Sequence, residues 1–188
     1  MTDRKNKRGC IALAQPLISG QLVDFITGEI VDDTEDERCR QKIAKLLVEE
    51  KGYSKEDVQV NRKLELVVDG RTWVSRVDFA LALEGRVFMI IRFGPGSIVS
   101  RERPVLAAAR LLEPYEIPFA VVTNGSDAQI LDTSSGKVVG QGMEAIPSKG
   151  DILKVFAELR FNQISRKRLE MERRILFVFD AVGNCELS

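Results

Sequence analysis

Residues 73–93 read WVSRVDFALALEGRVFMIIRF, and this stretch decides the fold. Trp73 to Leu83 and Arg86 to Phe93 are predicted strands, and Glu84-Gly85 between them is a two-residue turn signal. The run from Val87 to Ile91 is apolar on both faces, which is typical of a central strand covered by helices. The stretch therefore predicts an antiparallel pair of strands, the second of them at the centre of a sheet.

Hydrophobic periodicity and turn residues predict the remaining elements on either side of this pair. They are, in chain order, a disordered basic tail over residues 1–9, a short hairpin over 22–31, a helix over 35–51, a strand over 58–68, a helix over 101–112, a strand over 119–123, a small hairpin over 128–139, a long helix over 149–174 and an edge strand over 175–179. We expect one domain over residues 10–188, with an α/β fold in which helices flank a mixed β-sheet.

The composition excludes several classes of site. The 188 residues contain no histidine, which rules out Ser-His and Cys-His nucleophiles, and the three cysteines are too far apart for a zinc motif. Basic and acidic residues both number 28, so no net charge draws the chain to nucleic acid. No apolar run approaches the roughly 20 residues of a membrane span. We expect a cytoplasmic protein that makes no membrane contact.

Four short motifs occur in order along the chain, and together they suggest a family. They are Thr34-x-x-Glu37-x-x-Arg40-Gln41, Lys51-Gly52-Tyr53, Arg76-Val77-Asp78 and Val121-Val122-Thr123-Asn124-Gly125. In this order they resemble the nuclease-like N-terminal domain of the restriction (R) subunit of type I restriction enzymes, a member of the PD-(D/E)xK superfamily. The resemblance covers residues 34–125 and implies a restriction-endonuclease-like core.

The resemblance also implies residue roles. The superfamily hydrolyses phosphodiester bonds with magnesium, a hard cation that carboxylate oxygens hold. Asp78 matches one metal carboxylate of the family, and Glu37 matches an assisting glutamate on the first helix, so both are candidate catalytic and metal-binding residues. Arg40, Gln41 and Arg76 belong to the same motifs and are candidate DNA contacts.

The second carboxylate and the lysine of the family form a Glu-x-Lys on the next strand, and this pair is missing here. With a two-residue turn at Glu84-Gly85, Asp78 faces Ile91, and both positions expected to hold the pair are apolar. With the register shifted by one residue, Asp78 faces Arg92, which then replaces the lysine as a cation, but Ile90 stands where the carboxylate is needed. Neither register supplies the second metal ligand.

Two interpretations of this loss stay open. In one, Asp78 and Glu37 bind magnesium with a migrated acid such as Glu102 or Glu65, and Arg92 is the catalytic cation. In the other, the fold persists without catalysis.

A further candidate surface follows the central strand. The loop over residues 94–97 leads to a helix whose first turn carries Arg101 and Arg103, and helix amides with two arginines can hold a phosphate. The alternative is a plain turn with Ser100 as N-cap. The basic cluster over residues 160–174 is typical of a solvated helix face.

We therefore expect a restriction-related domain with a degenerate site, which binds DNA or acts in a complex with a restriction-system or helicase protein. One alternative is an active magnesium-dependent deoxyribonuclease. The other is a structural or oligomer-forming protein, for example a homodimer, with no nucleic-acid role.

Overall fold

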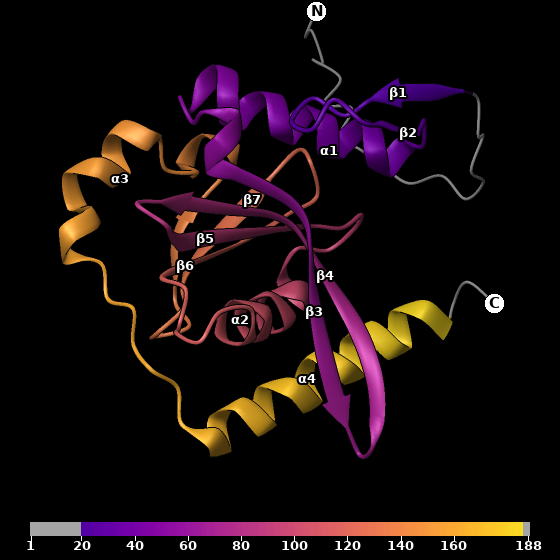
Figure 1. The fold of residues 1–188 in the computed structure, drawn as a ribbon, viewed down its shortest axis with the longest axis vertical. Coiled ribbons are helices and arrows are strands. Elements are labelled where there is room, and N and C mark those ends of the chain that lie inside the picture. The colour runs from indigo at the N-terminus through magenta and orange to yellow at the C-terminus, as the bar shows by residue number, and fades with distance from the viewer. Residues whose placement is uncertain (1–19, 186–188) are drawn as a thin grey trace, which may run out of the picture.

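The structure, a computed structural model, describes residues 20–185, so the expected tail over residues 1–9 lies outside the described residues. A six-stranded sheet occupies the centre, with helices on both sides (Figure 1). The strands and α-helices are β1 (Gln21–Val23), β2 (Ile30–Asp32), α1 (Glu35–Lys45), β3 (Val58–Val68), β4 (Arg71–Leu83), β5 (Arg86–Phe93), α2 (Glu102–Leu111), β6 (Phe119–Thr123), β7 (Ala128–Asp132), β8 (Val138–Gln141), α3 (Lys149–Val155) and α4 (Arg166–Cys185).

The sheet has the order β3-β4-β5-β6-β7-β8. β5 and β6 are parallel and α2 connects them, whereas the other neighbouring strands are antiparallel. β1 and β2 form a separate two-stranded hairpin beside α1. The expected α/β fold, a mixed sheet flanked by helices, is confirmed and is compatible with a restriction-endonuclease-like core.

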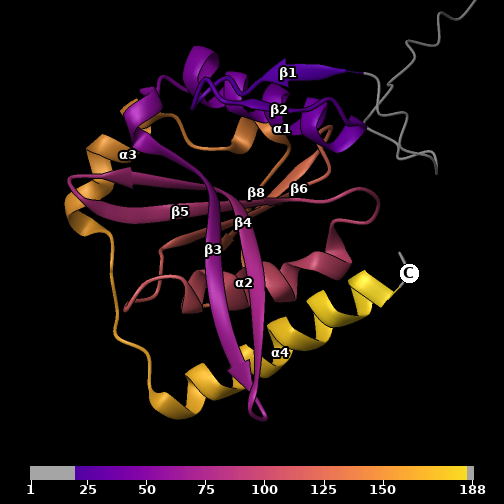
Figure 2. The same cartoon turned by 45° about the vertical axis from the view of Figure 1, so that its right-hand side comes forward.

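Each face of the sheet has its own hydrophobic core. On one face Ile43 and Leu47 of the first helical segment pack with Leu81 and Ile91. On the other face α2 and α4 lie together, as Figure 2 shows, and the alanine-rich side of α2 packs against the sheet with Leu176 of α4. β5 is buried from both sides, in agreement with its continuous apolar run.

The pairing of β4 with β5 combines the two expected registers. The turn at Glu84-Gly85 has two residues, because Leu83 pairs with Arg86, but a bulge then adds Phe88 to β5 and shifts every later pair by one residue. Phe88 is fully buried and packs against Tyr53 and Phe156. The extra residue therefore lets the strand fill the core on the α1 side.

The end of the first helix also differs from a regular α-helix. After Lys45 the residues Leu46–Glu50 form a π-helical turn, which ends where the Lys51 amide donates a hydrogen bond to the Leu46 carbonyl at 2.9 Å. Leu47, four residues after Ile43, stays on the buried face of the helix.

The expected long helix over residues 149–174 is wrong. α3 ends at Val155, a short 3-10 turn (Phe156–Glu158) follows, and the chain is extended until α4 begins at Arg166. Phe161 in this link packs edge-on to Tyr115 at 5.3 Å, and the Asn162 carbonyl accepts from the Glu116 amide at 2.8 Å. These contacts tie the link to the loop after α2, and a helix through the same residues would break them.

The expected edge strand over residues 175–179 is also wrong, because these residues belong to α4. Leu176 is fully buried where α4 packs on the core. The apolar residues that suggested a strand are therefore explained by the buried face of a helix.

Within residues 20–185, no helix is both long and apolar enough to span a membrane.

Candidate functional site

Asp78 lies where β4 separates from β5. The last β4–β5 pair toward this end joins Phe79 to Ile91, and on the other side the β3–β4 ladder is interrupted at Asn61, whose φ is 52°. Beyond that pair, the amide of Phe93 donates to Asp78 Oδ2 at 2.7 Å. The carboxylate thus takes the place of the strand carbonyl that a regular ladder would supply.

A guanidinium from α1 holds the other oxygen of Asp78. Arg40 Nε donates to Oδ1 at 2.7 Å, and Arg40 Nη1 lies 3.5 Å from Glu37 Oε2. The Arg40 guanidinium also lies 5.5 Å from the centre of the Phe93 ring. Burial acts to lower the pKa of Arg40, but the charge of Asp78 and its hydrogen bond outweigh burial and raise that pKa. Both oxygens of Asp78 are therefore engaged, and its side chain is only 12% exposed.

Glu37 and Gln41 continue this network along one face of α1, as their spacing of four residues allows. Gln41 Nε2 donates to Glu37 Oε1 at 2.7 Å and to Asp24 Oδ2 at 2.8 Å, and Gln41 Oε1 accepts from the Phe25 amide at 2.7 Å. A chain of polar contacts therefore runs from Asp78 through α1 to the loop between β1 and β2.

Asp24 is a buried carboxylate that was not among the predicted site residues. Its Oδ1 accepts from the amides of Ile26 and Thr27 and from the Thr27 hydroxyl. Burial acts to raise the pKa of Asp24, but the hydrogen bonds from Thr27, Gln41 and Ile26 outweigh it and lower the pKa below the ordinary 3.8. An Asp three residues before a Thr-Gly turn is the sequence signal that could have identified this side chain.

Acidification is expected to destabilise the protein partly through Asp24. Because its pKa in the folded state lies below 3.8, the carboxylate stabilises the fold above pH 3.8, and this contribution is lost as the pH falls through the folded-state pKa. The melting temperature of Asp24→Asn should fall less than that of the wild type between about pH 5 and pH 3. Asp32→Asn, an exposed position in β2, is the matched control. Equal losses in wild type and Asp24→Asn would contradict the role of Asp24.

Arg92 does not join Asp78 in the contacts that the structure describes. It lies one residue beyond the Phe79–Ile91 pair, at the level of Asp78, as the shifted register predicted. Its side chain nevertheless turns to the α4 side of the sheet, where Arg92 Nη2 donates to Asp180 Oδ1 at 3.0 Å. The cation beside Asp78 comes instead from α1.

Arg101 lies at the carboxyl ends of the parallel strands β5 and β6, which is the edge where α/β sheets place ligand sites. Its guanidinium packs over Gly94 and donates to the Pro95 carbonyl at 2.7 Å. Burial lowers the pKa of Arg101, and the nearby Arg92 lowers it further, whereas Asp36 and Asp78 act to raise it. Arg101 is therefore close enough to Asp78 for the charge of that carboxylate to act on its guanidinium.

The other predicted DNA contacts are dispersed. Arg40 and Gln41 are engaged within the α1 network. Arg103 lies 3.0 Å from Glu172 on α4, and Arg76 is exposed on the β3–β4 hairpin, opposite Lys63. The structure therefore brings Asp78, Glu37, Arg40 and Gln41 together, with Arg101 nearby, and places Arg76 and Arg103 elsewhere.

The residues of this site do not fit a magnesium ion as they are arranged. Among the residues that the structure describes, no three His, Cys, Asp or Glu side chains are grouped so that they could hold a metal. Asp78 already accepts from Arg40 and Phe93. Glu65 lies opposite Val74, four residues from the level of Asp78 and thus about 13 Å along the strand.

Comparison with known proteins identifies the family. Residues 35–147, from α1 to just beyond β8, match the family described as the type I restriction enzyme R protein N terminus. Neither the curated proteins nor the solved structures gave a match. Because the matched residues make up more than half of the 188, the chain belongs to the family of type I restriction enzyme R protein N termini.

Proposed function

We propose that this chain is a restriction-related domain with a PD-(D/E)xK ancestry that contacts DNA and no longer cleaves it. The observation that carries the proposal is the position of Asp78 between the Arg40 guanidinium and the Phe93 amide, each at 2.7 Å. A metal-dependent nuclease needs this carboxylate to offer oxygen to magnesium. Here a cation of the protein already supplies the positive charge, so the carboxylate stabilises the fold.

The neighbouring strand supports the same proposal. In the register that the bulge at Phe88 produces, Ile90 and Arg92 stand where Glu-x-Lys is expected. Ile90 is fully buried in the core beneath α2, and Arg92 is paired with Asp180. No carboxylate on β5 completes a metal site with Asp78.

Arg101 is the residue that we expect to contact DNA. A guanidinium has five donor hydrogens, and the Pro95 carbonyl accepts from one nitrogen of Arg101. The remaining donors lie at the strand-end edge, beside the family site, where a phosphate can accept from them. In its restriction context the domain would act with a separate partner protein of the system.

The test combines cleavage and binding. We expect no cleavage of double- or single-stranded DNA with magnesium or manganese, by the wild type or by Asp78→Ala. We expect salt-dependent DNA binding, measured by fluorescence anisotropy, that weakens in Arg101→Ala and whose salt slope falls by about one. Arg71→Ala is the matched control, because Arg71 is exposed at the far tip of the β3–β4 hairpin.

Other outcomes would overturn this function. Metal-dependent cleavage that disappears in Asp78→Ala would establish the active deoxyribonuclease, and Glu102→Ala and Glu65→Ala would then identify a migrated carboxylate. Absence of DNA binding at low salt would favour a structural or oligomer-forming role.

A further inference from the structure

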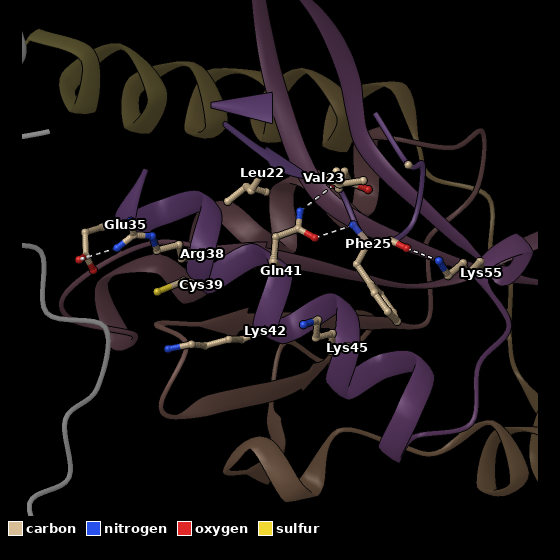
Figure 3. Close-up of a pocket in the computed structure, with 12 residues that line it drawn as sticks. Leu22, Val23, Phe25, Glu35, Arg38, Cys39, Gln41, Lys42, Lys45 and Lys55 are labelled. Atoms are coloured by element: carbon tan, nitrogen blue, oxygen red, sulfur yellow. Dashed lines mark hydrogen bonds and ion pairs between the residues drawn. The ribbon is translucent and has the colours of Figure 1, made fainter. Parts of the chain in front are cut away.

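A cavity of about 830 Å³ lies between α1 and the β1–β2 hairpin, on the side of α1 away from the α2–α4 layer (Figure 3). It is as large as the pockets that enclose small organic ligands in proteins. Its walls differ in chemistry, because α1 contributes mainly polar and basic side chains, whereas the β1 segment contributes Leu22, Val23 and Phe25. A ligand with one charged and one apolar part fits such a cavity.

The charged wall is basic. Arg38, Lys42 and Lys45 recur at helical spacing on the outer face of α1, and Lys55 lies across the cavity. Arg38 is neutralised by Asp33, which its Nε contacts at 2.5 Å. The three lysines are exposed, and within residues 20–180 no carboxylate lies within ion-pair distance of any of their ammonium groups.

The acidic residues of the cavity do not compensate for these lysines. Glu35 lies 3.9 Å from Arg38, and both oxygens of Asp24 accept hydrogen bonds from Thr27, Gln41 and nearby amides. Four basic and two acidic side chains line the cavity, so it retains a net positive charge.

The aromatic ring of Phe25 lies between two of these lysines. The Lys55 ammonium is 4.4 Å, and that of Lys45 5.9 Å, from the centre of the Phe25 ring, and Figure 3 shows the ring between the two. The Phe25 amide donates to Gln41, and the Phe25 side chain packs against the hydrophobic core on the α1 side, so the ring has a defined position on the apolar wall. A planar apolar group bound beside Phe25 would have a lysine on either side, and these lysines could bind anionic groups attached to it.

We propose that this cavity binds a nucleoside phosphate, either as a free nucleotide or as part of a nucleic-acid strand. The ammonium groups of Lys42, Lys45 and Lys55 hold the phosphate oxygens by charge-assisted hydrogen bonds. The base lies against the wall formed by Leu22, Val23 and Phe25. A phosphate ion alone would leave most of the 830 Å³ and the whole apolar wall unused.

This site is separate from the edge at which we place DNA contact. Lys42 and Lys45 lie on a different face of α1 from Arg40, which turns to Asp78. Gln41 contacts both sides, because it bonds Glu37 on one side and Asp24 and Phe25 on the other. A ligand in the cavity can therefore act on the Asp78 network through one side chain.

The experiment measures ligand binding to the full chain by isothermal titration calorimetry, with a metal chelator present so that metal ions play no part. The ligands are ATP, a short single-stranded oligonucleotide and inorganic phosphate. We expect saturable binding of ATP or of the oligonucleotide that weakens at least about tenfold in the Lys42→Gln/Lys45→Gln variant. Lys137→Gln, an exposed lysine in the β7–β8 turn, should bind as the wild type does. Thermal melting checks that each variant is folded.

The ligands and variants distinguish the outcomes. ATP binding identifies a free nucleotide as the ligand, and binding of the oligonucleotide alone identifies a strand. No saturable binding of either, equal loss in Lys137→Gln, or phosphate binding as tight as that of ATP would overturn the proposal. Arg101→Ala should leave ATP binding unchanged, so failure of the DNA-contact proposal is distinguishable from failure of this one.

Discussion

Replacement of Glu172 by alanine is expected to lower the free energy of unfolding by about 3–5 kcal/mol. Glu172 is completely buried, and its Oε1 accepts from Arg110 Nη1 at 3.0 Å and from Arg168 Nε at 2.6 Å. Arg103 Nη2 lies 3.0 Å from Oε2 as an ion pair without hydrogen-bond alignment. The cost arises mainly at Arg110, which is 2% exposed. Glu116 and the Thr133 carbonyl still accept from Arg110 in the variant, but its Nη1 loses its acceptor and cannot regain water. Urea denaturation should show a lower midpoint with an unchanged m-value.

Two variants separate this effect from general damage to α4. Glu170→Ala, two residues away on an exposed face, should change stability by no more than about 0.5 kcal/mol. The pair Glu172→Leu/Arg110→Met replaces the buried charges by apolar groups and should recover most of the loss. If the double variant is as unstable as Glu172→Ala, the buried cation is not the cause.

The ion pairs at Glu172 also bear on the basic cluster over residues 160–174. Sequence spacing predicts a solvated helix face there, and Arg166 and Arg173 are indeed exposed. Arg168, however, turns to Glu172, and Arg103 reaches the same carboxylate from α2. Whether a charge faces water or a buried partner depends on how two distant helices pack, and no single segment contains that information.

The core elements were predictable because their signals are local. Alternating apolar residues with two-residue turns predict β3, β4 and β5. At the start of α1 the side chain of Thr34 accepts from the Glu37 amide, an N-cap formed by residues three positions apart. The bulge at Phe88 was not predictable in this way. Its cause is the space between Tyr53 and Phe156, which only the assembled core defines.

The candidate site shows the same limit. The motifs that bring Asp78 and Glu37 into consideration are short and ordered along the chain, and in the fold both carboxylates contact Arg40. The decisive contact, between Arg40 and Asp78, joins residues 38 positions apart, and the side chain of Arg92 is turned away by Asp180 of α4. Motif matching identified the residues, but not which cation would pair with the carboxylate.

Asp78→Ala is expected to lower the free energy of unfolding by about 2–3 kcal/mol. The substitution leaves the half-buried Arg40 guanidinium and the Phe93 amide without their acceptor. Asp78→Asn keeps an oxygen for one of these donors, but it loses the charge and the second acceptor, so it should cost less than Asp78→Ala, about 1–2 kcal/mol. Chemical denaturation of the three proteins should give free energies of unfolding that decrease in the order wild type, Asp78→Asn, Asp78→Ala.

This order distinguishes a structural carboxylate from a catalytic one. Carboxylates kept for metal binding lie in functional sites that often cost stability, so their removal tends to be neutral or stabilising. In a double-mutant cycle with Arg40→Met, the two losses should be less than additive, because both variants remove the same ion pair. A ligand that binds the folded state raises the melting temperature. Because we expect no magnesium site here, magnesium should leave the melting temperature of the wild type unchanged. Two results would contradict the structural role of Asp78: a melting temperature that rises with magnesium in the wild type but not in Asp78→Asn, or an Asp78→Ala protein more stable than the wild type. Either result would mean that a metal can replace Arg40 beside Asp78 and that the site still binds metal.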